Sequence, residues 1–183
     1  MATYLVTGAA GFIGARVSEF LLEDGHTVIG VDNLCDAYDV RLKLWRLERL
    51  QRNANFVFHH KDLCDLQALE AIFASLSSLE AIIHLAARAG VRYSVEDPWT
   101  FVNANVTGTL NTLEMAKRHK VPKYILASTS SIYGANAPIP TPEVADSSRP
   151  LQPYAATKKA AEALCHSYHF LYDIDVTLSL IHI

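Results

Sequence analysis

Short apolar runs alternate along the chain with longer segments in which apolar residues recur every three or four positions. The short runs predict buried strands, and the longer segments predict amphipathic helices. We expect strands at residues 5–7, 27–31, 55–60, 81–87, 123–128 and 175–180, and helices after the first glycine turn and at 39–50, 66–76, 99–119 and 153–172. This alternation, without internal repeats, predicts an α/β fold with a doubly wound parallel sheet of the Rossmann type.

Three glycines, Gly8, Gly11 and Gly14, follow the first strand and lead into the first helix. At this spacing the first allows a sharp turn, the second lets the backbone approach a pyrophosphate, and the third lets the helix pack close to the sheet. The same spacing also occurs in plain strand-to-helix turns. Asp32, at the end of the second strand, favours the dinucleotide interpretation, because its carboxylate can accept hydrogen bonds from an adenosine ribose. It would also repel a 2′-phosphate, which implies NAD rather than NADP.

Composition limits the class of protein. The chain has 183 residues, half of them hydrophobic, and a formal net charge of −3, so one domain can bury a core and no basic patch marks a nucleic-acid or membrane partner. No apolar run reaches the ~20 residues that a membrane helix needs. Cys35, Cys64 and Cys165 show no paired spacing, and His59 and His60 point to opposite faces of a strand, so we expect no metal site. We expect a cytoplasmic protein with small-molecule partners.

Polar residues gather where the later strands end. Asp62 and Leu63 follow the third strand, where an open parallel sheet places contacts to an adenine ring. We interpret residues 88–94 as a loop at the same edge, in which Arg88 and Arg92 could engage a phosphate or a carboxylate. The proline-rich stretch 138–150 is long for a connection, and such loops are commonly functional.

Three further predictions concern burial and packing rather than chemistry. His84 lies within an apolar strand, which favours a core histidine over a catalytic one. Gly108 lies inside a long helix, where glycine costs about 1 kcal/mol relative to alanine, so we expect something to pack closely there. In the helix at 39–50 the periodic apolar positions are Leu42, Trp45, Leu47 and Leu50, and we interpret its basic face as solvated.

Tyr154 and Lys158 are four residues apart in the last helix, so their side chains share one helical face. A tyrosine acts as a general base only when its pKa, about 10, is lowered toward neutrality, and the charge of Lys158 favours the phenolate. Thr129 can share the hydrogen bond of a substrate hydroxyl and relay its proton. The pair is also an ordinary helix-face neighbour pair. Its place after a hydroxyl-rich strand end in a nucleotide-binding sheet favours the catalytic interpretation.

Together these motifs closely resemble those of the extended short-chain dehydrogenase/reductases, and within that family those of the UDP-glucuronate 4-epimerases. They lie at residues 7–14, 32–34, 38–40, 62–63, 84–87, 89–94, 105, 128–129, 154 and 158. The resemblance implies a cofactor site made of Gly8, Gly11, Phe12, Ile13, Gly14, Asp32, Asn33, Asp62, Leu63, Leu85, Ala86, Ala87, Asn105, Tyr154 and Lys158. It implies a substrate site made of Val91, Arg92, Thr129, Ser130, Ser131 and Tyr154.

The resemblance also implies a reaction. In such enzymes the C4 hydroxyl of a nucleotide sugar gives its proton to the tyrosine and its hydride to bound NAD, and the 4-keto sugar then takes the hydride back on its other face. Thr129, Tyr154 and Lys158 would be the catalytic residues. Ser130 and Ser131 occupy the two positions at which the dehydratases of this family carry an Asp-Glu pair. The decarboxylating relatives carry a glutamate at the second of these positions. Serine hydroxyls cannot perform that acid–base work. UDP-glucuronate/UDP-galacturonate epimerisation is therefore implied, with another nucleotide sugar as the alternative.

Members of this family continue well past the length of this chain into a smaller substrate domain. We therefore expect residues 1–177 to form an NAD-binding domain and residues 178–183 to be an atypical tail at a truncation point. A non-catalytic NAD-binding module is then the alternative for this polypeptide. The resemblance also implies a homodimer of the full-length form, through the helices that begin at Trp99 and Pro153.

Overall fold

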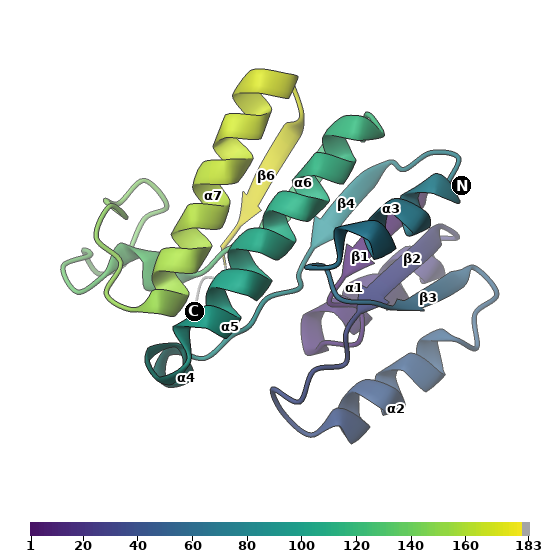
Figure 1. Ribbon diagram of the computed structural model, residues 1–183, viewed down its shortest axis with the longest axis horizontal. Coiled ribbons are helices and arrows are strands. Elements are labelled where there is room, and N and C mark those ends of the chain that lie inside the picture. The colour runs from purple at the N-terminus through teal and green to yellow at the C-terminus, as the bar shows by residue number, and fades with distance from the viewer. Residues whose placement is uncertain (181–183) are drawn as a thin grey trace.

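The computed structural model describes residues 1–180, in which six parallel strands form one sheet (Figure 1). The strands are β1 (Thr3–Thr7), β2 (Thr27–Asp32), β3 (Phe56–His60), β4 (Ala81–His84), β5 (Lys123–Ala127) and β6 (Asp175–Ser179). Their order in the sheet is β3-β2-β1-β4-β5-β6. The order reverses direction between β1 and β4, which confirms the predicted doubly wound arrangement.

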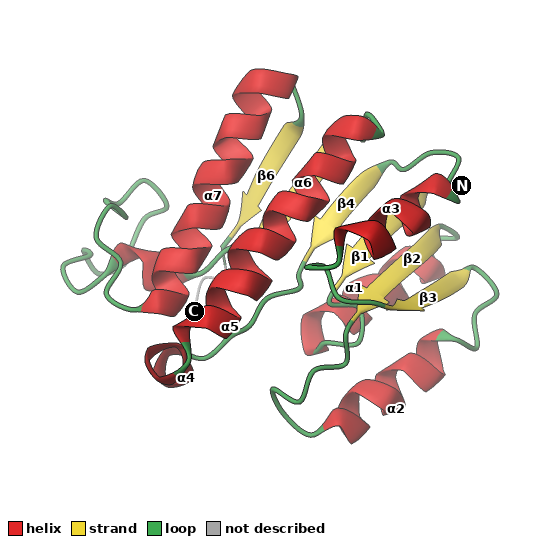
Figure 2. Ribbon diagram, viewed as in Figure 1, coloured by secondary structure: helices red, strands yellow, loops and turns green. Residues whose placement is uncertain are grey.

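Helices connect the strands and cover both faces of the sheet (Figure 2). The α-helices are α1 (Phe12–Glu23), α2 (Val40–Leu50), α3 (Leu66–Ala74), α4 (Val91–Glu96), α5 (Pro98–Val102), α6 (Gly108–Arg118) and α7 (Pro153–Tyr172). A π-helical segment, η1 (Asn103–Thr107), joins α5 to α6, and a 3-10 helix, η2 (Ser130–Tyr133), follows β5.

Two separate hydrophobic clusters lie against the sheet. One joins it to α3, α6 and α7, through residues such as Phe73, Leu113 and Cys165. The other joins it to α1 and α2, through residues such as Leu22 and Leu47. Because helices cover both faces, the central strands are apolar throughout rather than alternating. The two clusters hold the strand ends firmly, so the loops that follow them start from fixed positions.

Three segments differ from the sequence predictions. β4 ends at His84, because its partner β1 also stops there, at Thr7, where the glycine turn begins. Part of the predicted loop at 88–94 is the short helix α4, which starts after Gly90. The single helix predicted at 99–119 is interrupted by η1, because Asn105 within it bonds to the loop after β4.

The helix α2 buries only part of the apolar face that the sequence predicts, namely Leu47 and Leu50. Lys43, Leu47 and Leu50 are buried, whereas Leu42 and Trp45 are each about half exposed. These buried positions are four and three residues apart and so form one stripe. The interpretation of the basic side chains as solvated is wrong for Lys43, because it pairs with a buried carboxylate on β2.

Two further sequence predictions, the close packing at Gly108 and the tail at residues 178–183, can be compared with the structure. A Cβ at Gly108 would lie 3.4 Å from Cβ of Leu63, which confirms the expected close packing. β6 runs through Ser179, paired with Ala127, so the first residues of the predicted tail lie in the sheet. Residues 181–183 of that tail lie outside the described residues. No helix within residues 1–180 is long and apolar enough to cross a membrane.

Candidate functional site

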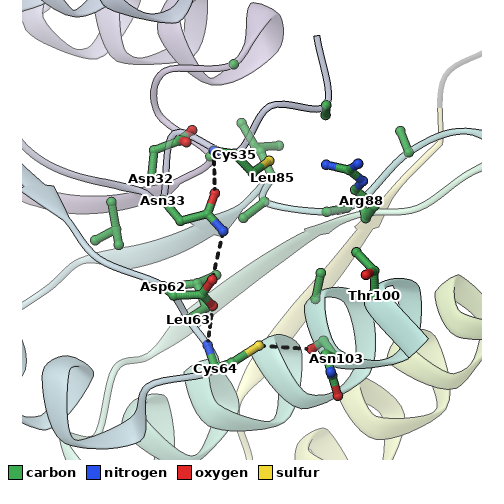
Figure 3. A pocket seen from close by; sticks show the side chains of 18 of the residues that line it. Asp32, Asn33, Cys35, Asp62, Leu63, Cys64, Leu85, Arg88, Thr100 and Asn103 are labelled. Atoms are coloured by element: carbon green, nitrogen blue, oxygen red, sulfur yellow. Dashed lines mark hydrogen bonds between the residues drawn. The ribbon is translucent and has the colours of Figure 1, made fainter. Parts of the chain in front are cut away.

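A cavity of about 510 Å³ lies at the carboxyl ends of the strands, where the strand order reverses (Figure 3). Open α/β sheets bind their ligands in such a crevice. Many predicted cofactor residues line it, namely Gly8, Gly11, Asp32, Asn33, Asp62, Leu63, Leu85, Ala86 and Ala87. The predicted site omits three other charged residues of the wall, Lys43, Lys61 and Arg88.

The turn between β1 and α1 has no room for side chains. Gly8 has φ +68°, and a Cβ there would lie 2.9 Å from the backbone of Ala86. A Cβ at Gly14 would lie 2.1 Å from the carbonyl oxygen of Gly8. Gly14 therefore makes room for the turn itself, rather than for the sheet as the sequence predicts. The glycine spacing leaves a cradle of bare backbone at the cavity.

The first turn of α1 presents N–H groups without side-chain partners. Its N-cap is Gly11, no side chain among residues 1–180 caps the helix with a hydrogen bond, and the first turn holds no acidic residue. The N–H groups of Phe12 and Ile13 and the positive end of the helix dipole are thus available to an anion such as a pyrophosphate. The side chains of both residues are exposed and lie outside the cavity wall, so only their backbone can take part.

Asp32 ends β2 at the cavity wall, and its carboxylate is almost fully buried. Oδ2 accepts the N–H of Ala10 at 3.2 Å, and Oδ1 accepts the N–H of Leu34 at 2.8 Å. Oδ1 also accepts from Nζ of Lys43 at 3.2 Å, in an ion pair whose two side chains are each 6% exposed. This one carboxylate therefore links three segments, namely the glycine turn, the loop that follows β2, and the helix α2. The charge of Lys43 also weakens the repulsion of a 2′-phosphate that the sequence predicts.

A hydrogen-bonded carboxylate lies at the end of β3. Asp62 accepts from Nδ2 of Asn33 and from the N–H of Cys64, both at 2.8 Å (Figure 3). Burial raises the pKa of Asp62, but these hydrogen bonds together lower it below its usual value. The next residue, Leu63, is fixed because its carbonyl accepts from Nδ2 of Asn111 at 2.8 Å. Hydrogen-bonding groups beside an apolar side chain suit an adenine ring.

Asn105 is fully buried in η1 and is not part of the cavity wall. Its Oδ1 accepts the N–H of Arg88 at 2.7 Å, and its Nδ2 donates to the carbonyl of Arg88 at 3.1 Å and to Oγ1 of Thr157 at 3.0 Å. Its neighbours Asn103 and Ala104 do line the cavity. Single π-helical turns recur at functional sites. Here the turn lets Asn105 hold the loop after β4 against α7.

The predicted base lies in the first turn of α7. The half-buried ring of Tyr154 packs edge-to-face against Phe101, with 6.2 Å between centroids. Lys158, one turn further, is 3% exposed. Burial lowers the pKa of Lys158 to about 8, against the opposing effects of Cys165 and Glu162, which raise it. Lys158 therefore stays largely charged at neutral pH, on the helical face that it shares with Tyr154.

Thr129 follows β5 and caps η2. Its Oγ1 accepts the N–H of Ser131 and donates to Oγ of Ser131, both at 3.2 Å. The preceding Ser128 donates a hydrogen bond from its hydroxyl to the carboxylate of Glu162 on α7. The strand end that carries Thr129 is therefore tied to the helix that carries the other two predicted catalytic residues.

The remaining predicted substrate residues also lie outside the cavity wall. Val91 and Arg92 are exposed on α4, and Ser130 is exposed at the start of η2. Both α4 and η2 contact α7. The cavity thus gathers the predicted dinucleotide residues, and the predicted catalytic and substrate residues occupy neighbouring elements around α7.

His84 is confirmed as a core residue. It is 1% exposed, with Nδ1 2.9 Å from Oγ1 of Thr7 and Nε2 3.1 Å from Oγ1 of Thr109. Burial, and to a lesser degree the charge of Lys158, lowers the pKa of His84 to about 3. The imidazole is therefore neutral in the folded protein near neutral pH and serves as a structural link.

We expect acid to destabilise the protein in part through His84. Its pKa of about 3 in the folded protein lies below the ordinary histidine value of 6.5, which applies to the unfolded state. Between these values the unfolded state binds more protons, so this stability is full above pH 6.5 and is lost as pH falls toward 3. One group contributes at most about 1.4 kcal/mol per pH unit. Urea unfolding from pH 7 to 5 should show a shallower pH dependence for His84→Gln than for the wild type, and equal slopes would contradict this expectation.

Comparisons with known proteins agree with this architecture. A family model described as GDP-mannose 4,6 dehydratase matches residues 5–182. A UDP-glucuronate 4-epimerase of Thermodesulfobacterium geofontis is 56% identical over 178 residues, which are 97% of this chain and 54% of that protein. A probable UDP-glucuronate 4-epimerase of Rhizobium meliloti is 48% identical over 174 residues, which are 95% of this chain and 51% of that protein.

Solved structures show the same likeness. The UDP-glucuronic acid 4-epimerase of Bacillus cereus, in complex with UDP-glucuronic acid and NAD, superposes with a TM-score of 0.83 at 35% identity and covers 96% of this chain and 55% of that one. The UDP-glucose 4-epimerase of Thermotoga maritima with UDP-glucose gives a TM-score of 0.85 at 35% identity, and the match covers 96% of this chain and 54% of that one. The chain spans about half the length of the curated relatives it matches.

Proposed function

Because this chain belongs to the extended short-chain dehydrogenase/reductases of the GDP-mannose 4,6 dehydratase family, we propose that it serves a nucleotide-sugar 4-epimerase. In this proposal the chain binds NAD and supplies the catalytic base. The substrate is UDP-glucuronate, which is interconverted with UDP-galacturonate through a 4-keto sugar. The observation that carries the proposal is a cavity lined by the predicted dinucleotide residues, together with a neighbouring helix that carries Tyr154 and the buried Lys158.

The wall of the cavity fits NAD. Bare backbone at Gly8 and Gly11, next to the uncapped start of α1, suits a pyrophosphate. The carboxylate of Asp32 suits a ribose, and Asp62 and Leu63 suit an adenine ring. The related Bacillus cereus structure contains NAD. When bound, the nicotinamide would accept a hydride from the sugar and return it.

The residues around α7 would handle the proton. Tyr154 would accept the proton of the sugar C4 hydroxyl at its phenolic oxygen and later return it. Lys158 lies one turn further along the same face of α7, where its buried ammonium group brings a positive charge to that side of the helix. Thr129 would share the hydrogen bond of that hydroxyl, and its tether to α7 through Ser128 and Glu162 supports such an approach. A proton that leaves and returns matches a reaction without net oxidation.

Two serines favour epimerisation over dehydration. Elimination of water from the sugar needs an acid and a base, and the hydroxyls of Ser130 and Ser131 provide neither. Oγ of Ser131 accepts a hydrogen bond from Oγ1 of Thr129 at 3.2 Å, beside the proposed reaction centre. We infer that these hydroxyls hold the sugar carboxylate through neutral hydrogen bonds. The 4-keto intermediate, a β-keto acid, then meets no acid–base partner that would promote loss of carbon dioxide.

Product analysis tests this function. A form of the protein that spans the full length of its relatives is incubated with NAD and UDP-glucuronate, and the nucleotide sugars are resolved by chromatography and mass spectrometry. We expect UDP-galacturonate to form without net accumulation of NADH. Conversion of UDP-glucose alone would favour the alternative substrate. NAD binding without any turnover would favour a non-catalytic dinucleotide-binding module.

A further inference from the structure

One guanidinium in the cavity wall has no acceptor among residues 1–180. The side chain of Arg88 lines the cavity just after the β4 end (Figure 3). Within residues 1–180 its guanidinium makes no hydrogen bond or ion pair, whereas Lys43 in the same wall is paired with Asp32. The pKa of Asp97 is lowered mainly by hydrogen bonds from Thr100 and only slightly by the charge of Arg88. The five donors of this guanidinium are therefore available to an anion.

The backbone of Arg88 is fixed more firmly than that of an ordinary loop residue. Asn105 bonds to both its N–H and its carbonyl, at 2.7 and 3.1 Å, and is itself fully buried and bonded to Thr157. The base of the side chain therefore stays in place when a ligand binds. A donor that is already positioned loses less entropy on binding than one on a mobile loop.

The loop that carries Arg88 touches the glycine turn. Backbone atoms of Ala86, two residues earlier, lie 2.9 Å from the position that a Cβ at Gly8 would occupy. Both Gly8 and Arg88 line the same cavity. A diphosphate at the start of α1 would thus lie beside the loop after β4. Guanidinium groups bind phosphate oxygens through two parallel hydrogen bonds, which lysine cannot form.

We propose that Arg88 binds the diphosphate of the dinucleotide from the β4 side of the cavity, while the start of α1 binds it from the β1 side. This inference rests on the proposed function. A nucleotide sugar also carries a diphosphate. We assign Arg88 to the dinucleotide because Gly8, Gly11 and Asp32 line the same cavity. Arg92, which the sequence selects for a ligand, lies on α4 outside that wall and is exposed.

Calorimetric titration of the 183-residue chain with adenosine, ADP and UDP tests this assignment. Loss of a hydrogen bond to a charged group costs about 1.5–3 kcal/mol, so Arg88→Ala should weaken ADP binding by roughly 10–100-fold. Adenosine affinity should stay unchanged, because adenosine carries no phosphate. Arg88→Lys should recover only part of the ADP affinity. The matched control, Arg52→Ala, removes the same charge from an exposed position outside the cavity and should change neither affinity.

The other possible results of the titrations would each contradict the assignment of Arg88. An equal loss for adenosine and ADP would show that Arg88 only shapes the loop, and an equal loss of ADP affinity in Arg52→Ala would show a general charge effect. A loss for UDP without a loss for ADP would assign the residue to the nucleotide sugar. Each of these overturns the proposal and leaves the dinucleotide site standing. A wild-type chain that binds neither adenosine nor ADP would overturn the proposed cofactor site and this inference with it.

Discussion

Tyr154→Phe is expected to lower the turnover number by about 10²–10⁴-fold, the usual contribution of a general base. The change removes only the phenolic oxygen, and the edge-to-face contact with Phe101 remains available to phenylalanine. Lys158 stays buried one turn away, so the electrostatic setting is kept. NAD affinity should change little, because Tyr154 lies outside the cavity wall.

The measurement compares turnover and NAD binding in the full-length form. Tyr172→Phe is the matched control, since it removes the same atom from the other end of α7. That variant should keep its turnover number. A Tyr154→Phe protein that retains most of its turnover number would exclude Tyr154 as the base. A parallel loss in both variants would point to damage of α7 instead.

Lys43→Met is expected to destabilise the protein by about 3–5 kcal/mol, because it leaves the carboxylate of Asp32 buried without a counter-charge. Both side chains of the pair are only 6% exposed, and Asp32 also holds the N–H groups of Ala10 and Leu34. Methionine is an unbranched apolar side chain only one heavy atom shorter than lysine, so the change removes the charge and little volume. Urea unfolding at pH 7 measures the loss.

A second substitution shows whether the loss of stability in Lys43→Met comes from the unpaired charge of Asp32 or from altered packing. Asp32→Asn combined with Lys43→Met removes both charges and should recover much of the stability that Lys43→Met loses, because no buried charge remains. Arg41→Met removes a charge of the same helix that pairs with Asp39 at the surface, and should leave the unfolding midpoint unchanged. A double variant as unstable as Lys43→Met would show that the carboxylate is not the cause.

The sequence determined the layout of the fold. Each predicted strand appears, because a strand buried on both faces needs a nearly continuous apolar run. The glycine spacing located the turn at the cavity, since only residues without Cβ fit where Gly8 meets Ala86 and Gly14 meets Gly8. The core position of His84 and the close packing at Gly108 were also predictable from residue type within a periodic segment.

Tertiary structure decided which charged side chains are buried and which face the cavity. Periodicity placed Lys43 on a solvated face, but its ammonium group is buried because Asp32, eleven residues earlier, accepts from it. Arg88 and Arg92 look equivalent in the sequence, and only Arg88 lines the cavity, because Asn105 holds its backbone and α4 carries Arg92 away. The local pattern of apolar and polar residues indicates whether a segment prefers helix or strand and which of its positions are buried. The partner of a charge is set by contacts between elements distant in sequence, and such contacts leave no periodic signal.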